Sequence, residues 1–235
     1  MGPLLKVEKI HTYIGQYHIL QGIDFEVHKG EVTVLLGRNG AGKTTALRSI
    51  MGLNPVSKGR ILFKNEEIHT LPTYRIAQKG IGYVPEDHGI FGELTVEENF
   101  VVAGRSEDDS VKERQEWILV LFPDLKKVWN RPASNLSGGE KQMLSIARAF
   151  VNDDELLLID EPSKGLAPIM VEKLIQAIHE IKEKRTVVLV EQHFYMAACV
   201  GERFYIIDDG VTVTSGEMAE LKGNSELKKQ YLGIA

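Results

Sequence analysis

A glycine-rich segment at Gly37–Thr44 carries the clearest chemical signal. It reads GRNGAGKT and matches GxxxxGK[ST], which between a strand and a helix binds phosphate through backbone N–H groups. In such a loop the lysine, here Lys43, reaches the β- and γ-phosphates of a nucleotide, and the hydroxyl, here Thr44, can ligate Mg²⁺. A glycine-rich turn that only caps a helix is the alternative. The residues expected to contact the nucleotide are Gly37, Arg38, Asn39, Gly40, Ala41, Gly42, Lys43, Thr44 and Thr45.

Two adjacent carboxylates, Asp160 and Glu161, directly follow the apolar segment LLLI. A carboxylate such as Asp160 suits Mg²⁺, held directly or through water. Glu161 is then placed to orient or deprotonate the attacking water, a role typically worth about 10² to 10⁴ in rate. An acidic pair that only solvates a strand end is the alternative. The phosphate loop in the same chain favours the functional interpretation.

A second helix start suited to an anion lies in the segment LSGGE. As a capping box, Ser137 would accept a hydrogen bond from the N–H three residues on while Glu140 reaches back, and this needs no ligand. Gly138 and Gly139 nevertheless weaken a helix unless its backbone approaches another group closely. We expect this segment either to bind a second anion or to face the nucleotide of another molecule.

Glu86 and His193 follow two other apolar runs, in YVPE and VVLVEQH. A lone His or Glu is more often solvated or satisfied than functional. These two, however, share their placement with the phosphate loop and the acidic pair, just beyond a predicted strand. Open α/β sheets bind ligands at the carboxyl edge of their strands, so the sequence predicts that all four groups converge on one triphosphate.

Four short apolar runs are the elements that must position these groups. They span 32–36, 81–84, 156–159 and 187–190, are too short for helices, and are apolar on both faces, as in a parallel sheet covered on both sides. Helical patterns lie between them, at Thr44–Met51, Glu140–Phe150 and Val171–Ile181. This alternation predicts an α/β fold with a phosphate-loop core.

Other segments predict an antiparallel layer and a helical insertion. Leu4–Ile14 and Ile19–Val27 read as strands with no helix between them, and the Asp209-Gly210 turn predicts a hairpin between two further strands. Residues from about 87 to 150 carry several helix-like segments and no strong strand, and Thr95 to Glu98 starts one helix with a capping pattern. We expect an antiparallel β subdomain attached to a core whose sheet is mixed or parallel.

The composition excludes several other classes of protein. The 235 residues are 43% hydrophobic and 26% charged, as in an ordinary globular chain. The net charge is −5, whereas nucleic acid needs a basic face, so no nucleic-acid partner is expected. No apolar stretch approaches the roughly 20 residues of a membrane span. The single cysteine, Cys199, cannot form an internal disulfide, which favours a reducing compartment.

The motif order resembles the ATPase subunit of ATP-binding-cassette (ABC) transporters. A phosphate loop, LSGGE, LLLIDEP and a trailing EQH follow one another over the whole chain, and LSGGE separates this family from other phosphate-loop enzymes. The resemblance implies one ABC ATPase domain, 1–235, with a nucleotide-binding core plus β-layer at about 1–86 and 152–235 and a helical subdomain at about 87–151. It also implies ATP hydrolysis with Mg²⁺ near Thr44, Glu86 and Asp160.

By the same resemblance, two cassettes pair head to tail with two ATP between them. Each ATP lies between the phosphate loop of one cassette and the signature residues of the other, Ser137, Gly138, Gly139 and Glu140. Glu161 is then the catalytic base, His193 the switch histidine at the γ-phosphate, and Ser163–Ala167 the loop that links the two sites. The implied partners are a second ATPase subunit, identical or homologous, integral membrane permeases and, indirectly, an extracytoplasmic solute-binding protein. This places the chain peripherally on the cytoplasmic face of the membrane.

Within the family, LPTYRIAQKGIGYVPEDHGIFGELTVEEN, DEPSKGLAPIMVEKL and a C-terminal YLG resemble LivF-type ATPases of branched-chain amino-acid importers. The implied function is to power the uptake of branched-chain or other hydrophobic amino acids. Amide and urea importers share much of the pattern. Two further classes compete with transport: a soluble ABC ATPase, which tends to carry two cassettes or basic patches, and a phosphate-loop kinase, which leaves LSGGE unexplained.

Three positions depart from the family pattern. Glu86 stands where most cassettes have glutamine, and Ala167 stands where aspartate is common. Ile14 holds the place of the aromatic residue that stacks on adenine, and Tyr13 precedes it. Because neighbouring strand residues face opposite sides, only one of the two can touch the base. Either Ile14 makes an apolar contact, or a local bulge turns Tyr13 inward.

Overall fold

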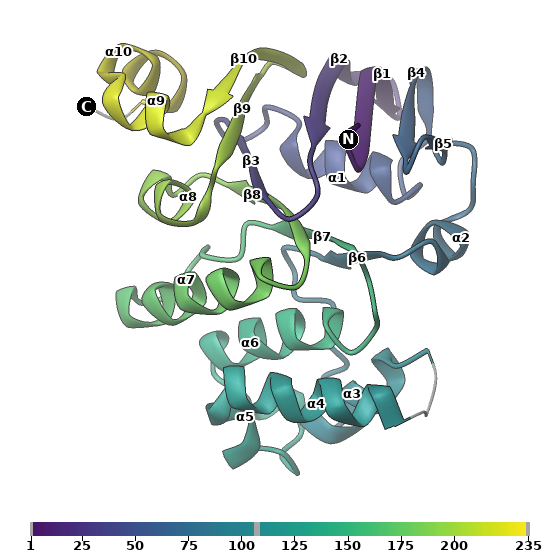
Figure 1. Cartoon of the computed structure of the whole chain (residues 1–235), viewed down its shortest axis with the longest axis vertical. Coiled ribbons are helices and arrows are strands. Elements are labelled where there is room, and N and C mark those ends of the chain that lie inside the picture. Colours follow the sequence, from purple (N-terminus) through teal and green to yellow (C-terminus); the bar gives the residue numbers. More distant parts are fainter. Residues whose placement is uncertain (1, 106–108, 234–235) are drawn as a thin grey trace.

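The computed structural model describes residues 2–105 and 109–233. One sheet contains β3 (Val32–Leu36), β6 (Ile81–Val84), β7 (Leu156–Asp160), β8 (Thr186–Glu191), β9 (Arg203–Asp208) and β10 (Val211–Glu217). Its strand order is β10-β9-β3-β8-β7-β6 (Figure 1). The four predicted core strands are confirmed and pair in parallel. The predicted hairpin is also confirmed, since β9 turns back into β10 at Asp209 and Gly210, which both have positive φ.

The second sheet is antiparallel and confirms the predicted β-layer. It contains β1 (Leu5–Ile14), β2 (Tyr17–Val27), β4 (Val56–Phe63) and β5 (Glu66–Glu67), in the order β2-β1-β4-β5. Helix α1 (Lys43–Ile50) lies between the two sheets (Figure 1). Its Leu47 and Ile50 share one buried cluster with Ile23 of β2 and Leu158 of β7. The antiparallel layer therefore covers the helix that begins at the phosphate loop.

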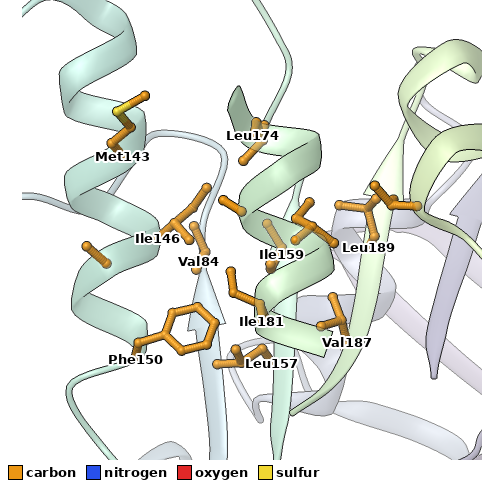
Figure 2. Close-up of a cluster of buried hydrophobic side chains, with 14 of the residues drawn as sticks. Val84, Met143, Ile146, Phe150, Leu157, Ile159, Leu174, Ile181, Val187 and Leu189 are labelled. Carbon is orange, nitrogen blue, oxygen red and sulfur yellow. The ribbon is translucent and has the colours of Figure 1, made fainter. Parts of the chain in front are cut away.

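Helices cover the opposite face of the parallel sheet. They are α6 (Gly138–Ala149), α7 (Pro168–Lys182) and α8 (Phe194–Val200). Figure 2 shows Ile146 of α6 and Ile181 of α7 packed with Leu157 and Ile159 of β7. Burying each such side chain stabilises the fold by roughly 1.5–3 kcal/mol. Since successive strand residues face opposite sides, Leu158 points instead toward α1, which explains why these strands are apolar throughout.

The segment between β6 and β7 is helical in its described part. It contains α3 (Val96–Ala103), α4 (Asp109–Leu121), α5 (Pro123–Lys127) and a 3₁₀ turn (Ala133–Asn135) before α6. These helices form the end of the molecule opposite the antiparallel sheet (Figure 1). Thr95 caps α3 with the predicted capping box, in which both hydrogen bonds are present.

Five short helical elements were not predicted. They are α2 (Thr73–Gln78), α8, α9 (Met218–Gly223), α10 (Ser225–Leu227) and a π-helical turn (Lys228–Leu232). Each is too short to give a clear helical period in the sequence. Within residues 2–105 and 109–233, no helix combines the length and hydrophobicity required to cross a membrane.

Candidate functional site

The phosphate loop joins the carboxyl end of β3 to α1. Gly42 forms the N-cap of α1 with a φ of 107° and no side-chain cap, so the first N–H groups of the helix are not held by a capping side chain. Glycine is needed there, because a Cβ would also lie 2.9 Å from Leu20 Cδ2. These uncapped backbone donors, together with the positive end of the helix dipole, suit an anion.

Lys43 is buried inside this loop. Its Nζ donates to the carbonyl oxygens of Gly37 and Arg38, each at 3.0 Å, and lies 3.4 Å from Glu161 Oε1. Burial lowers the pKa of Lys43 because it disfavours the charged form, and the Glu161 carboxylate opposes that shift. The lysine and the carboxylate that the sequence assigns to phosphate binding and water activation are thus brought together.

Asp160 is fully buried at the end of β7 and faces two hydroxyl groups. Thr44 Oγ1 donates to its Oδ1 at 3.0 Å, and the Tyr83 hydroxyl donates to its Oδ2 at 3.4 Å. Burial is the main reason why the pKa of Asp160 rises to about 6, and the nearby Glu161 and Glu86 add to it. No lysine or arginine of the described residues forms an ion pair with Asp160.

A cation fits this place. The Thr44 hydroxyl and the Asp160 carboxylate offer hard oxygen ligands, and Mg²⁺ is usually bound by one or two carboxylates together with substrate phosphates and water. No cluster of three or more His, Cys, Asp or Glu side chains suited to a metal is found among the described residues. Glu86 lines the same 560 Å³ cavity as Thr44 and Asp160. Its carboxylate, however, accepts a hydrogen bond from Lys164.

Glu161 has an uncommon backbone conformation. Its φ is +44°, and non-glycine residues held in the left-handed region often mark functional sites. Besides Lys43, its carboxylate contacts the Gln192 amide, which donates to Oε1 at 2.5 Å, and Lys164, whose Nζ lies 3.8 Å from Oε2. Gln192 also donates to the side chain of Asn39 in the phosphate loop. Glu161 is therefore linked to both neighbouring loops.

His193 follows β8 and begins α8 as its N-cap. Its side chain is exposed, while its backbone N–H donates to Oε2 of the buried Glu191 at 3.1 Å. The Glu191 carboxylate also accepts from the N–H groups of Ser163 and Gln192, at 3.0 and 3.1 Å. Burial raises the pKa of Glu191. This buried side chain fixes the loop after β7 and the start of α8 relative to each other.

The signature segment starts α6 on another part of the surface. Ser137 and Glu140 form the predicted capping box, with both hydrogen bonds present. No hydrogen bond or ion pair found among the described residues joins them to the phosphate loop. A Cβ on Gly139 would lie 2.6 Å from Met170 Cε, whereas a Cβ on Gly138 would meet nothing within 4 Å. Packing against Met170 thus explains why residue 139 is glycine. The backbone at Gly138, in contrast, has open space beside it.

Tyr13 and Ile14 lie at the end of β1, each about half exposed, at 46% and 48%. The pairing of β1 with β2 shifts register between Thr12 and Tyr13, as the bulge alternative requires. The Tyr13 ring is stacked on His18, with ring centroids 4.3 Å apart. Both side chains are therefore accessible to a bound base.

Tyr83, Lys164 and Gln192 enter the site without having been assigned a role from the sequence. Tyr83 belongs to a strand that was interpreted only as apolar. The available sign of a role for Tyr83 was its phenol, which lies two residues after Ile81 in an otherwise aliphatic run. Lys164 is a cation three residues after Glu161, and Gln192 precedes His193. The positions of Lys164 and Gln192 in the sequence do not reveal which carboxylate each side chain contacts.

Comparison with known proteins identifies relatives of nearly full length. Residues 20–164 match the family described as ABC transporter. The chain is 39% identical over 232 residues to the high-affinity branched-chain amino acid transport ATP-binding protein BraG of Pseudomonas aeruginosa, covering 98% of this chain and 100% of the relative. It is 35% identical to the probable branched-chain amino acid transport ATP-binding protein LivF of Archaeoglobus fulgidus, covering 98% and 99%. Identity to the lipopolysaccharide export system ATP-binding protein LptB of Escherichia coli is 32%, covering 99% and 98%.

Solved structures give the same result for the fold. An ATP-binding cassette of an ABC transporter superposes with a TM-score of 0.87 at 25% identity and covers 100% of both chains. A dimeric cassette in a post-hydrolysis state, bound to ADP and Pi, superposes with a TM-score of 0.80 at 25% identity, covering 91% of this chain and 98% of the other. The predicted α/β fold class is thereby confirmed.

Proposed function

The chain belongs to the ABC transporter family as one of its ATP-hydrolysing subunits, and we propose that it powers the import of branched-chain or other hydrophobic amino acids. The names of the BraG and LivF relatives support this substrate class. The LptB relative, at 32% identity, serves an export system. Amide or urea transport, another ABC transporter, and a soluble ABC ATPase are the competing functions.

Within this function, we assign phosphate binding to the loop between β3 and α1. Lys43 directs its N–H donors at two loop carbonyls and at the neighbouring Glu161. Incoming β- and γ-phosphates carry more negative charge than those carbonyls, so Lys43 exchanges these partners for phosphate oxygens. The N–H groups at the start of α1 hold the remaining phosphate oxygens.

We assign water activation to Glu161 and cation binding to Asp160 and Thr44, with Glu86 beside them. Mg²⁺ bound there would neutralise charge on the β- and γ-phosphates. Glu161 lies next to Lys43 and is held by Gln192, so it can accept a proton from a water near the γ-phosphate. His193 is assigned to the γ-phosphate, since Glu191 fixes its backbone at the start of α8.

Further partners complete the proposal. The open backbone at Gly138 and the exposed Ser137 suit the ATP held by a second subunit, identical or homologous. Permease subunits in the membrane would receive the motion, with an extracytoplasmic solute-binding protein acting through them, and no nucleic acid takes part. The chain would then lie peripherally on the cytoplasmic face of the membrane. ATP bridging two subunits favours the paired state, and loss of the γ-phosphate releases it.

The single observation that carries the catalytic assignment is the buried pair of Lys43 and Glu161 at the mouth of the phosphate loop. The variant Glu161→Gln keeps the shape of the side chain and removes the proton acceptor. We expect at least about a 100-fold loss of ATP turnover, with affinity for a fluorescent ATP analogue retained. Glu183→Gln, an exposed change at the end of α7, is the control. Near-normal phosphate release from Glu161→Gln would contradict the assignment.

The substrate class needs a separate test. The chain is assembled with its permease and binding-protein partners in lipid vesicles, and uptake of radiolabelled leucine is measured with ATP on the side of this subunit. We expect ATP-dependent uptake that unlabelled isoleucine or valine suppresses and urea does not. Uptake suppressed only by amides or urea, or no uptake with intact ATP turnover, would refute amino-acid import and leave the ATPase assignment in place.

A further inference from the structure

Lys164 connects two carboxylates that belong to different loops. It lies in the loop after β7, where its ammonium group donates to Glu86, which follows β6. The same Nζ lies 3.8 Å from Oε2 of Glu161. Both carboxylates raise the pKa of Lys164, and the hydrogen bond to Glu86 contributes most. One exposed lysine thus joins the end of β6 to the proposed catalytic base.

The charge balance at this edge of the sheet makes the lysine important. Glu86, Asp160 and Glu161 bring three carboxylates together, and Lys43 and Lys164 are the cations that pair with them among the described residues. Once Lys43 turns to bound phosphates, Lys164 is the one described cation that still pairs with Glu86 and Glu161. Without Lys164, repulsion between these two carboxylates would displace the more exposed one, Glu86.

Glu86 creates this need. Its carboxylate lines the cavity of Thr44 and Asp160 and helps to raise the pKa of Asp160. A glutamine there would add no charge and would need no counter-ion.

We propose that Lys164 is a positioning residue: it holds Glu86 in place and screens it from Glu161, so that Glu161 keeps its orientation during ATP hydrolysis. The inference rests on the role assigned to Glu161 under the proposed function. Lys164 itself touches no reacting atom. Its removal should therefore lower kcat and leave ATP affinity unchanged, and the loss should depend on the carboxylate of Glu86.

A double-mutant cycle tests this dependence. The purified full chain, Lys164→Met, Glu86→Gln and the double variant are compared in kcat and KM for ATP and in equilibrium affinity for a fluorescent ATP analogue. We expect Lys164→Met to lower kcat about tenfold when Glu86 is retained and less than about twofold when it is combined with Glu86→Gln. Affinity should stay within about twofold between the wild type and Lys164→Met, and between Glu86→Gln and the double variant. Lys164→Arg, which keeps the cation, should restore at least about half of kcat.

Lys79→Met is the matched control, because Lys79 also pairs with a glutamate of another element, Glu66, away from the site. It should leave kcat unchanged. Thermal unfolding checks the fold, and Lys164→Met should keep the wild-type midpoint because exposed ion pairs contribute little. An equal loss of kcat with and without the Glu86 carboxylate, or no loss, would overturn the positioning role alone. A wild-type chain that hydrolyses no ATP either alone or with a homologous ATPase subunit would overturn the proposed function and this inference with it.

Discussion

At the scale of single residues, the carboxylates of the site differ in what surrounds them. Asp160 is fully buried and faces only hydroxyl groups among its hydrogen-bond partners. Glu191 is buried but accepts three backbone N–H groups. Glu86 is exposed and paired with Lys164. Of these three carboxylates, only Asp160 is buried without a cationic or backbone N–H partner among the described residues. This is why a divalent cation fits beside it.

This burial predicts a pH-dependent stability. The pKa of Asp160 is about 6 in the folded chain, against an ordinary value of 3.8. Because the folded state holds this proton more tightly, the contribution of Asp160 to stability falls as the pH rises through that window. Relative to a carboxyl that keeps its ordinary pKa on folding, the buried Asp160 destabilises the folded state by about 1 kcal/mol at pH 4.5 and by about 3 kcal/mol at pH 7.5. Asp160→Asn should therefore stabilise the nucleotide-free, metal-free chain more at pH 7.5 than at pH 4.5.

Urea unfolding followed by tryptophan fluorescence at both pH values measures this difference. Asp24→Asn changes an exposed aspartate and should have little effect at either pH. A stabilisation by Asp160→Asn that is the same at both pH values would show that the carboxyl does not titrate in this window.

At the scale of elements, helix α6 links the signature segment to the loop after β6. Ser145 Oγ donates to the carbonyl of His88, and Arg148 Nη1 donates to that of Gly89, both at 2.5 Å. A movement of α6 would therefore move the loop that carries Glu86. The division into a core and a helical subdomain at about 87–151 stays a prediction. Both hydrogen bonds lie within that range, and they tie α6 to residues that closely follow Glu86.

The two glycines of α6 should respond differently to alanine. Gly138 faces open space, whereas a Cβ on Gly139 would crowd Met170. We expect Gly138→Ala to leave the free energy of unfolding unchanged or raise it by up to about 1 kcal/mol, because alanine is the better helix former. The same variant should lower ATP turnover at least about tenfold, because the methyl group blocks the approach of a partner's nucleotide.

Gly139→Ala should instead lower the stability by about 1 kcal/mol, because Met170 must move aside. Urea unfolding and phosphate release, measured on both variants, separate the two effects. Full activity of Gly138→Ala would mean that nothing approaches this backbone during turnover.

Asn99 anchors the loop that leads into α3. It is fully buried, its Oδ1 accepts from the N–H of Phe91 at 2.9 Å, and its Nδ2 donates to the carbonyls of Phe91 and Thr95 at 2.9 Å each. Asn99→Ala should cost about 1–3 kcal/mol, since it removes a fully buried side chain and leaves the N–H of Phe91 without its acceptor. Urea unfolding measures the loss, with the exposed Asn130→Ala as control. A loss below about 0.5 kcal/mol would mean that water replaces the side chain.

At the scale of the whole molecule, the segments of the proposed nucleotide site lie in two separate places on one chain. The phosphate loop and the carboxylates lie at one edge of the parallel sheet, while Ser137 starts a helix that shares no described hydrogen bond or ion pair with them. A dimeric cassette with ADP and Pi has the same fold. Pairing of two chains is the arrangement that would bring the two half-sites together.

Pairing should be visible in solution. We expect Glu161→Gln with ATP to sediment at twice the monomer mass of 26.3 kDa, because uncleaved ATP keeps bridging the two half-sites. With ADP the same variant should sediment as a monomer, and adding Ser137→Ala should weaken the ATP-bound dimer. Sedimentation of Glu161→Gln as a monomer at micromolar concentration with saturating ATP would contradict pairing of identical chains. In that case a homologous subunit would be the partner to test.

The sequence by itself determined the features that are local along the chain. These features are GRNGAGKT, the acidic pair and the two capping boxes. Each consists of residues within a few positions of one another, so its spacing alone identifies it. The core strands were equally predictable, because each is buried on both faces and is therefore apolar throughout.

Only the tertiary structure decided which of these features meet. The order β3-β8-β7-β6 places β8 between the strands that carry the phosphate loop and the acidic pair. As a result, Gln192 reaches both Asn39 and Glu161, and Lys164 reaches Glu86. These pairs are separated by 31 to 153 positions in the chain. Such contacts leave no local pattern, because strand order and side-chain direction depend on the packing of the whole fold.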